Sequence, residues 1–322
     1  MPKIELFGPV SEELEIVEAE LSKNINTRLD LLRKASTHLI AAGGKRLRPA
    51  FALLAARVYQ KDLGHVVPLA VALELIHMAS LVHDDVIDNS LTRRGTDTVK
   101  RAWGNRMSIY AGNYILARSL ALVAGYQRSD IVDVLADASM DICEGEIIQM
   151  MSAYNVNLGL KNYLRRIERK TALLISVSCQ LGAMVSNADE DEVRAVKNYG
   201  YYLGMAFQIT DDILDFVADE QALGKPTGSD IRQGVITLPA WYALRCAPEK
   251  EELAVLLSSP EACKTDAEHI IDIVVNSDGI EYAYHVSQHF ARKAEKCLDM
   301  VPDGEAKEAF LNISDFILDR EF

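Results

Sequence analysis

Apolar residues recur at every third or fourth position through long segments of the chain, and this spacing predicts amphipathic helices. The clearest example carries Leu69, Ala72, Leu73, Ile76 and Ala79 along one face. The prolines stand where such segments begin or end, which is where helices tolerate them. The chain shows neither alternating segments joined by Asn-Gly or Asp-Gly nor a strand followed by a glycine-rich turn. We therefore predict an all-α fold.

The domain organisation follows from the absence of any linker rich in Gly, Ser or Pro. We predict a single domain over residues 1–322. The longest polar interruption, residues 218–234, is too short and too specific for a linker, so we interpret it as a functional loop within that domain.

Composition and charge exclude several classes of function. Lys and Arg number 34 against 47 Asp and Glu, and the net charge of -13 argues against a broad nucleic-acid surface. No uninterrupted apolar run approaches the roughly 18 residues of a membrane span, and the acidic N-terminus has no apolar signal core. The five cysteines show no CxxC spacing. We expect them to be reduced, buried thiols in a cytoplasmic protein.

An acidic pattern, D-D-x-x-D, occurs twice inside apolar segments, in HDDVID (83–88) and TDDILDF (210–216). On a helix its first and last carboxylates lie one turn apart on one face, and the second lies about 100° around. Such carboxylates repel each other and are poorly solvated among apolar neighbours unless a cation lies between them. Oxygen ligands without His or Cys partners favour Mg²⁺ shared with substrate phosphates. The alternative is a solvated helix face, which accounts for one pattern better than for two.

Four motifs supply basic residues around the acidic patterns: GGKRLRP (43–49), LTRRG (91–95), ERKTALL (168–174) and GKPTGSD (224–230). A glycine turn that opens a helix leaves amide donors for an anion, and arginine forks suit a diphosphate. Taken singly, each motif is equally an ordinary helix end or connector. Their co-occurrence indicates sites for two diphosphate groups.

The motifs GGKRLRP, LVHDDVIDNSLTRRG, RKTALL and FQITDDILDF, in this order, resemble those of the trans-polyprenyl diphosphate synthases, and the match runs from about residue 43 to residue 239. The stretches VALELIHMASLVHDDVID and YLRRIERKTALLI resemble the catalytic subunits, component II, of bacterial heptaprenyl diphosphate synthases. The resemblance implies a helical bundle around a central cavity, with the two acidic patterns facing each other near its mouth, and a dimer interface.

The resemblance also implies roles for individual residues. It assigns Mg²⁺ binding to Asp84, Asp88 and Asp211, with Asp85, Asp212 and Asp215 in support. It assigns the allylic diphosphate to Arg93, Lys170, Thr171, Gln208 and Lys225. It assigns isopentenyl diphosphate to Lys45, Arg48, His77 and Arg94. His77 lies two turns before Asp84 and so shares its helix face, but without the family it would be read as a core histidine.

The implied reaction is the head-to-tail condensation of isopentenyl diphosphate with an allylic diphosphate such as farnesyl diphosphate. Charge neutralisation by Mg²⁺, Arg and Lys makes the diphosphate a good leaving group. The double bond of isopentenyl diphosphate attacks the allylic cation, and the departing diphosphate accepts the proton. This chemistry needs no side-chain nucleophile, and the chain has no Ser-His-Asp or Cys-His grouping.

Product length is predicted to depend on Ala79 and Ser80, one turn before Asp84. Both are small, whereas short-chain relatives carry an aromatic ring there, and the next turn, at Leu75 and Ile76, lies about 6 Å deeper. We predict a long apolar tunnel and a product of C30 to C40, with C35 indicated by the resemblance. The alternative is that the two small residues only allow close helix packing.

Several positions depart from the family pattern. Asn113 stands where the family has Asp, Asp97 where it has Pro, and Val235 where it often has Lys or Asn. None of them is an inferred metal ligand. Glu146 and Gln149, in GEIIQM, match the long-chain form of that motif.

Three other functions remain open at this stage: a shorter-chain farnesyl or geranylgeranyl diphosphate synthase, a class I terpene cyclase, and a non-catalytic synthase subunit. A cyclase usually has a different second metal motif, and a non-catalytic subunit need not retain both acidic patterns. The sequence leaves open a homodimer or a heterodimer with a small dissimilar subunit. A long product also predicts transient membrane contact during release and use as a quinone side chain, as in menaquinone.

Overall fold

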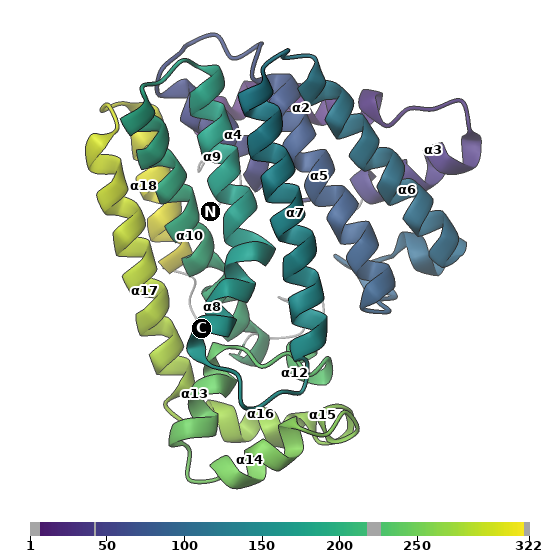
Figure 1. Ribbon diagram of the computed structural model, residues 1–322, viewed down its shortest axis with the longest axis vertical. Helices are drawn as coiled ribbons and strands as arrows, with labels where there is room; N and C mark the ends of the chain where they lie inside the picture. The colour runs from purple at the N-terminus through teal and green to yellow at the C-terminus, as the bar shows by residue number, and fades with distance from the viewer. Residues whose placement is uncertain (1–6, 42, 218–226, 319–322) are drawn as a thin grey trace. The chain divides into compact units, whose positions relative to one another are not determined.

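The computed structural model describes residues 7–41, 43–217 and 227–318, and these residues are helical almost throughout (Figure 1). The elements up to residue 152 are η1 (Gly8–Val10), α2 (Ser11–Asn24), α3 (Asp30–Ala41), α4 (Leu47–Arg57), α5 (Val67–Ile87), β1 (Thr92–Arg93), β2 (Thr96–Asp97), α6 (Val99–Ala124) and α7 (Ser129–Ser152). The elements after it are α8 (Leu160–Ile167), η2 (Glu168–Ala172), α9 (Leu173–Val185), α10 (Glu190–Val217), α12 (Ser229–Arg232), α13 (Leu238–Cys246), α14 (Lys250–Leu257), α15 (Ala262–Thr265), α16 (Ala267–Val275), α17 (Gly279–Cys297), η3 (Leu298–Met300) and α18 (Glu305–Leu318). The strands β1 and β2 form one short antiparallel hairpin. The predicted all-α class is confirmed.

The chain folds into two compact units, and each is assembled from three separate segments. The first unit consists of Met1–Ala136, Leu174–Asn198 and Cys297–Ile313. The second unit consists of Asp137–Leu173, Tyr199–Lys296 and Ser314–Phe322. Neither unit is therefore a contiguous stretch of sequence, and one domain over residues 1–322 stays a prediction.

The first unit is built around α5, which packs against α2, α4 and α6. Most of its residues are buried, because the helix is apolar on nearly every face until it reaches its acidic end. Close helix contacts depend on small residues: a Cβ at Gly112 on α6 would lie 2.4 Å from the His83 ring. The first acidic pattern thus projects from the last turn of a helix that the core holds firmly.

Helix α5 is also long and apolar enough, by length and composition, to cross a membrane. However, 67% of the apolar stretch of this helix is buried within the protein. Core helices of globular proteins have the same composition, since they too are surrounded by apolar side chains. We therefore interpret α5 as the central core helix of its unit.

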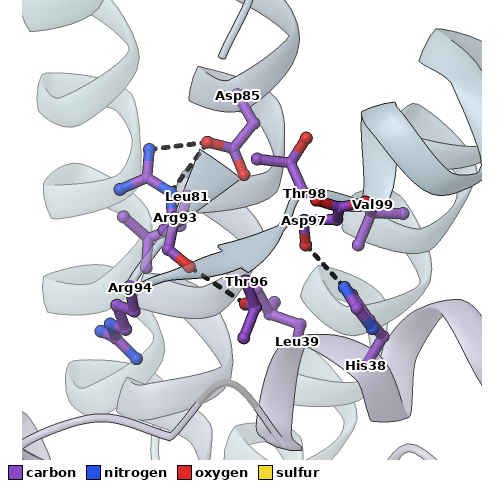
Figure 2. Close-up of a pocket in the computed structure, with 10 residues that line it drawn as sticks. All are labelled: His38, Leu39, Leu81, Asp85, Arg93, Arg94, Thr96, Asp97, Thr98 and Val99. Carbon is purple, nitrogen blue, oxygen red and sulfur yellow. Dashed lines mark hydrogen bonds and ion pairs between the residues drawn. The ribbon is translucent and has the colours of Figure 1, made fainter. Parts of the chain in front are cut away.

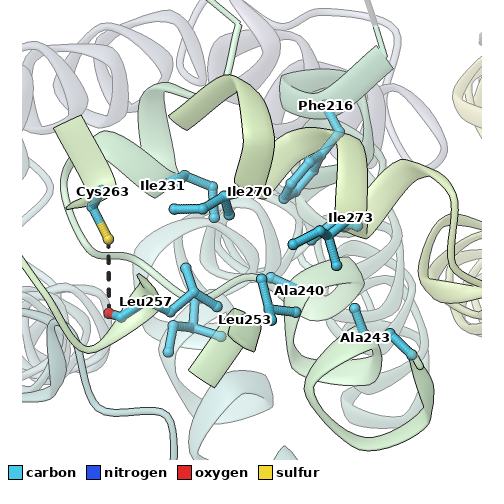
Figure 3. Close-up of a cluster of buried hydrophobic side chains, with 12 residues drawn as sticks. Phe216, Ile231, Ala240, Ala243, Leu253, Leu257, Cys263, Ile270 and Ile273 are labelled. Carbon is cyan, nitrogen blue, oxygen red and sulfur yellow. Dashed lines mark hydrogen bonds between the residues drawn. The ribbon is translucent and has the colours of Figure 1, made fainter. Parts of the chain in front are cut away.

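The second unit places the other acidic pattern near the C-terminal end of α10. Phe216, directly after that pattern, belongs to a buried cluster with Ile231, Leu253, Ile270 and Ile273 (Figure 3). The cluster joins the end of α10 to the short helices α12 to α16. Burying these apolar side chains fixes the position of the last turn of α10 against the helices α12 to α16.

The cysteines depart in part from the sequence prediction. None of the five forms a disulfide, as expected; Cys179 and Cys263 are buried, and Cys297 is half-buried. Cys143 and Cys246, however, are exposed, so the prediction of burial is wrong for these two. Both lie on helices that have a solvent-facing side, α7 and α13, where a small side chain is tolerated at the surface.

Candidate active site

The first acidic pattern lies where α5 ends. Asp88 is the C-terminal cap of the helix, with its backbone N–H donating to the Asp84 carbonyl at 2.8 Å. The following residue, Asn89, has φ of 55°, which turns the chain away from the helix axis. Asp84 and Asp88 are partly exposed, whereas Asp85 is 2% exposed. The structure therefore confirms the one-turn spacing of Asp84 and Asp88 and separates Asp85 from them.

Asp85 is paired with Arg93 of the β1–β2 hairpin. Arg93 donates from Nε at 2.8 Å and from Nη2 at 2.7 Å to one oxygen of Asp85, as Figure 2 shows. Burial raises the pKa of Asp85, and Arg93 opposes that shift. This pair closes one side of a small cavity that Arg94, Thr96 and Asp97 also line. Asp85 thus anchors the hairpin through Arg93, and its supporting role in Mg²⁺ binding stays a prediction.

The GGKRLRP loop leads into α4 through two residues with left-handed backbone, Gly43 (φ 71°) and Arg46 (φ 50°). Arg46 donates to Glu18 at 2.7 and 2.9 Å and to Glu74 at 3.0 Å, so two carboxylates hold its guanidinium group. Arg48 follows in the first turn of α4, and its Nε is buried with no hydrogen-bond partner among the described residues. Arg46 is therefore neutralised, whereas Arg48 has unused donor capacity.

His77 lies among these arginines. Burial, and after it the charges of Arg48 and Arg94, hold the pKa of His77 well below its ordinary value. His77 is therefore neutral near pH 7 and adds a hydrogen-bonding group without adding charge. Of the residues predicted to bind isopentenyl diphosphate, the structure brings Arg48, His77 and Arg94 into one cluster. The exposed Lys45 lies on the loop that leads to it.

The second acidic pattern is held by contacts from α8 and α12 and from Gln208 on its own helix. Asp212 is 3% exposed and accepts hydrogen bonds from Tyr163 of α8 and from Gln208, each at 2.8 Å. Asp215 accepts one from the backbone N–H of Asp230 at 2.9 Å. Asp211 is partly exposed, whereas Asp212 and Asp215 are buried. Sequence reasoning missed Tyr163, because nothing in its local pattern distinguishes it from a core tyrosine.

Burial, and after it the charge of Asp230, raises the pKa of Asp212 to about 7. Hydrogen bonds from Gln208 and Tyr163 oppose the shift but do not cancel it. A carboxylate in this position is destabilising when it is ionised and no cation is bound. Ionised Asp212 therefore destabilises the site when no cation is bound, and a bound cation would reduce this destabilisation.

Replacing Asp212 with Asn is expected to stabilise the metal-free protein at pH 8 but not at pH 5. The folded pKa of about 7 lies above the unfolded value, about 3.9. Between these values the folded state binds more protons, so the contribution of Asp212 to the free energy of unfolding falls as the pH rises. One pKa unit corresponds to about 1.4 kcal/mol. At pH 8 we therefore expect the variant to exceed the wild type by at least about 1 kcal/mol.

Urea unfolding with a chelator present, at pH 5 and at pH 8, measures this difference. Asp137→Asn, at an exposed position on α7, is the matched control and should give the same difference at both pH values. A difference between Asp212→Asn and the wild type that does not change with pH would contradict the prediction.

Lys170 and Thr171 lie in η2, a π-helical turn, and not in a regular α-helix as the sequence indicated. Thr171 donates to Gln208, and Lys170 donates to Gln149 at 3.1 Å. A Cβ at Gly204 on α10 would lie 2.5 Å from Ala172 Cα, so only glycine allows the two elements to approach this closely. Inserted π turns are frequent at functional sites because they change which side chains face a neighbour.

Arg169 and Lys170 differ in their partners. Arg169 is paired with Asp141 at 3.1 Å and with Glu144 at 2.8 Å. Within the described residues Lys170 donates to the neutral amide of Gln149, and its own side chain is exposed. Its charge is therefore available to an anion. Lys225, predicted to act with it, lies outside the described residues.

The two proposed gate residues lie on α5 one turn before Asp84. Ala79 is 2% exposed, and the Ser80 hydroxyl donates to the His77 carbonyl at 2.9 Å. Leu75 and Ile76, one turn further from the acidic end, are buried. The small size of both gate residues and the apolar turn behind them are consistent with the predicted gate, which stays a prediction.

A family model for polyprenyl synthetase matches residues 29–274. The chain belongs to the polyprenyl synthetase family. It is 44% identical to heptaprenyl diphosphate synthase component 2 of Geobacillus stearothermophilus over 317 residues, which cover 98% of each chain. It is 43% identical to the component 2 of Bacillus subtilis, covering 98% of this chain and 90% of the relative.

Solved structures of the family agree with the fold. Heptaprenyl diphosphate synthase from Staphylococcus aureus superimposes with a TM-score of 0.91 at 39% identity, covering 97% of this chain and 98% of that one. A polyprenyl synthase from Caulobacter crescentus, in complex with calcium and isoprenyl diphosphate, gives a TM-score of 0.94 at 33% identity, covering 99% and 98%. The polyprenyl synthetase is thus a prenyltransferase of isoprenoid biosynthesis, as the motifs indicated.

Proposed function

We propose that this polyprenyl synthetase is a long-chain trans-polyprenyl diphosphate synthase that extends an allylic diphosphate with isopentenyl diphosphate to heptaprenyl diphosphate. The observation that carries the proposal is the cluster of Arg48, His77 and Arg94 beside α5, the helix that ends in Asp84 and Asp88. Cationic groups beside a helix that carries carboxylates are what a diphosphate and its counter-cation require. The heptaprenyl synthases among the relatives support the product length.

The residues present fit Mg²⁺ as the cofactor. Asp84, Asp88 and Asp211 offer partly exposed carboxylate oxygens, the donors that this hard cation prefers. Within residues 7–41, 43–217 and 227–318, no three His, Cys, Asp or Glu side chains form a ligand group by themselves. This suits Mg²⁺, which is commonly bound by one or two carboxylates together with substrate phosphates. When bound, Mg²⁺ neutralises diphosphate charge and makes that group a better leaving group.

We propose that the side chains divide the two substrates between them. Arg48, His77 and Arg94, with Lys45, bind the diphosphate of isopentenyl diphosphate, because Arg48, His77 and Arg94 lie near one another and Arg48 has a buried donor without a partner among the described residues. Lys170, Thr171 and Gln208 bind the allylic diphosphate together with Arg93 and Lys225. The apolar residues along α5 exclude water from the hydrocarbon chain, which protects a reactive cation from hydrolysis.

The proposed reaction balances without a protein nucleophile. The C–O bond to the allylic diphosphate breaks, and the diphosphate leaves with the electron pair. The double bond of isopentenyl diphosphate forms the new C–C bond, and the released diphosphate accepts the proton that is lost. The basic side chains hold both diphosphates in place while the charge on the leaving group develops.

We also propose that the synthase acts with a second chain in the cytoplasm. The relatives named component 2 support a two-component enzyme, so the second chain is either another copy or a small dissimilar subunit. The C35 hydrocarbon is strongly apolar, and transfer of the product to a membrane follows from that property.

Product analysis tests the proposed function. The purified chain, alone and co-expressed with the products of neighbouring genes, is incubated with farnesyl diphosphate, isopentenyl diphosphate and Mg²⁺, and the products are measured by mass spectrometry. We expect heptaprenyl diphosphate and consumption of isopentenyl diphosphate. A terpene cyclase would not consume isopentenyl diphosphate, a shorter-chain synthase would stop at C15 or C20, and a non-catalytic subunit would be inactive under both conditions.

A further inference from the structure

The central turn of α5 carries a buried carboxylate, Glu74, near Arg46, Arg48 and Arg94. Glu74 is 2% exposed and lies one turn before His77 on the same helix. A carboxylate buried on an apolar helix is costly unless cations compensate it. The structure supplies one close cation directly: Arg46 Nη1 donates to Glu74 Oε1 at 3.0 Å.

The other oxygen of Glu74, Oε2, is buried and has no hydrogen-bond partner within the described part of the chain. The same holds for Nε of Arg48. Unsatisfied buried groups are costly and rare in folded proteins, and they concentrate where function requires them. The unpartnered donor of Arg48 is available to an anion, whereas the carboxylate of Glu74 acts on the neighbouring guanidinium groups through its charge.

The arginines around Glu74 are crowded together. A Cβ at Gly44 would lie 2.7 Å from Arg94 Nη1 and 3.1 Å from Arg46 Nη1, so these two nitrogens are within 5.8 Å of each other, the sum of those distances. Glycine at position 44 is what allows both guanidinium groups to reach the loop. Two like charges at this separation repel strongly unless an anion lies nearby.

The charge of Glu74 reaches all three arginines. Burial lowers the pKa of Arg48 to about 10, and Glu74 opposes that shift. Burial also lowers the pKa of Arg94, and Glu74 again opposes it. For Arg46, the contacts with Glu18 and Glu74 outweigh burial and raise the pKa. Glu74 is thus a carboxylate whose charge acts on all three of these arginines.

We propose that Glu74 is a positioning residue for isopentenyl diphosphate binding: its buried carboxylate holds Arg46 and offsets the charges of Arg48 and Arg94, so that these two remain together where a diphosphate then binds. The inference rests on the proposed function. Glu74 does not itself contact the anion, since two negative groups repel; it acts through the guanidinium groups. Without its charge the three cations would separate and the donors would no longer point to a common ligand.

The decisive variant is Glu74→Gln, which keeps the shape of the side chain and removes only its charge. We expect the KM for isopentenyl diphosphate to rise at least about tenfold, the loss that one charge-assisted contact represents. We expect kcat to change by less than about threefold and the KM for farnesyl diphosphate by less than about twofold, because those depend on other groups. Glu74→Asp, which restores the charge on a shorter side chain, should recover part of the loss.

Glu20→Gln is the matched control. Glu20 pairs with Lys23 on α2 and its side chain is 35% exposed, so its loss should leave both KM values within about twofold of wild type. A purely structural role for Glu74 would alter kcat and both KM values together. An unchanged or lower KM for isopentenyl diphosphate would overturn the proposal, because the carboxylate would then only offset positive charge.

A binding measurement separates this inference from the proposed function. Isothermal titration calorimetry with isopentenyl diphosphate, without allylic substrate, compares the wild type with Glu74→Gln. If the wild type binds this ligand but makes no product, the proposed function is overturned. The positioning role can still be measured in that case, as weaker binding by the variant. A wild type that does not bind it, or equal binding by both proteins, overturns the positioning role.

Discussion

Replacing Asp84 with Asn is expected to lower kcat for chain elongation by about a thousand-fold. The change removes one carboxylate charge and keeps the shape of the side chain at the end of α5. Charge stabilisation by a bound metal contributes several kcal/mol to a transition state, and a thousand-fold loss corresponds to about 4 kcal/mol. Asp84 is partly exposed on the same helix face as Asp88, so the loss falls on metal binding and not on core packing.

Steady-state rates with farnesyl diphosphate and isopentenyl diphosphate measure this effect. A second readout is the rise in unfolding temperature when Mg²⁺ and inorganic diphosphate are added together, which should be smaller in the variant. Asp97→Asn is the control: Asp97 is exposed on the β1–β2 hairpin and pairs with Arg101 at 3.2 Å. We expect its rate to stay within about twofold of wild type. An Asp84→Asn rate within tenfold of wild type would exclude Asp84 as a metal ligand.

Replacing Ala79 with Phe is expected to change the main product from C35 to C20 or shorter. Ala79 is buried on α5, one turn before Asp84. A phenyl ring adds bulk on the path that the growing hydrocarbon is predicted to take. Ile76→Phe places the same ring one turn, about 5 Å, further along the helix, and should give a product of intermediate length. The product length distribution by mass spectrometry is the measurement.

Overpacking must be separated from gating, because inserting a large side chain into a core destabilises by about 1 to 3 kcal/mol. Met78→Phe serves this purpose: Met78 is 2% exposed on the same helix, about 100° from Ala79 around the axis. It should lower the unfolding temperature without shortening the product. If Ala79→Phe leaves the product distribution unchanged, Ala79 and Ser80 serve only to pack helices closely.

The site divides into residues that the sequence identified and residues that only the structure revealed. The two acidic patterns, the glycine loop and the basic motifs were recognisable because each lies within a few residues, where helix geometry decides which side chains share a face. Their membership in one family followed from their order along the chain. The sequence did not distinguish the roles of Arg93 and Arg94. In the structure Arg93 pairs with Asp85, whereas Arg94 lies beside Gly44.

Helical periodicity and local spacing were enough to predict an all-α protein and the one-turn separation of Asp84 from Asp88, and the resemblance of the motifs to a known family implied the enzyme class. Tertiary structure decided what spacing cannot encode. Tyr163 and Asp212, and likewise Arg46 and Glu74, meet across long stretches of chain, and the π turn at Lys170 accompanies a close approach by Gly204. Local patterns depend on neighbours in sequence, whereas the burial of a charge and its partners depends on how distant segments pack.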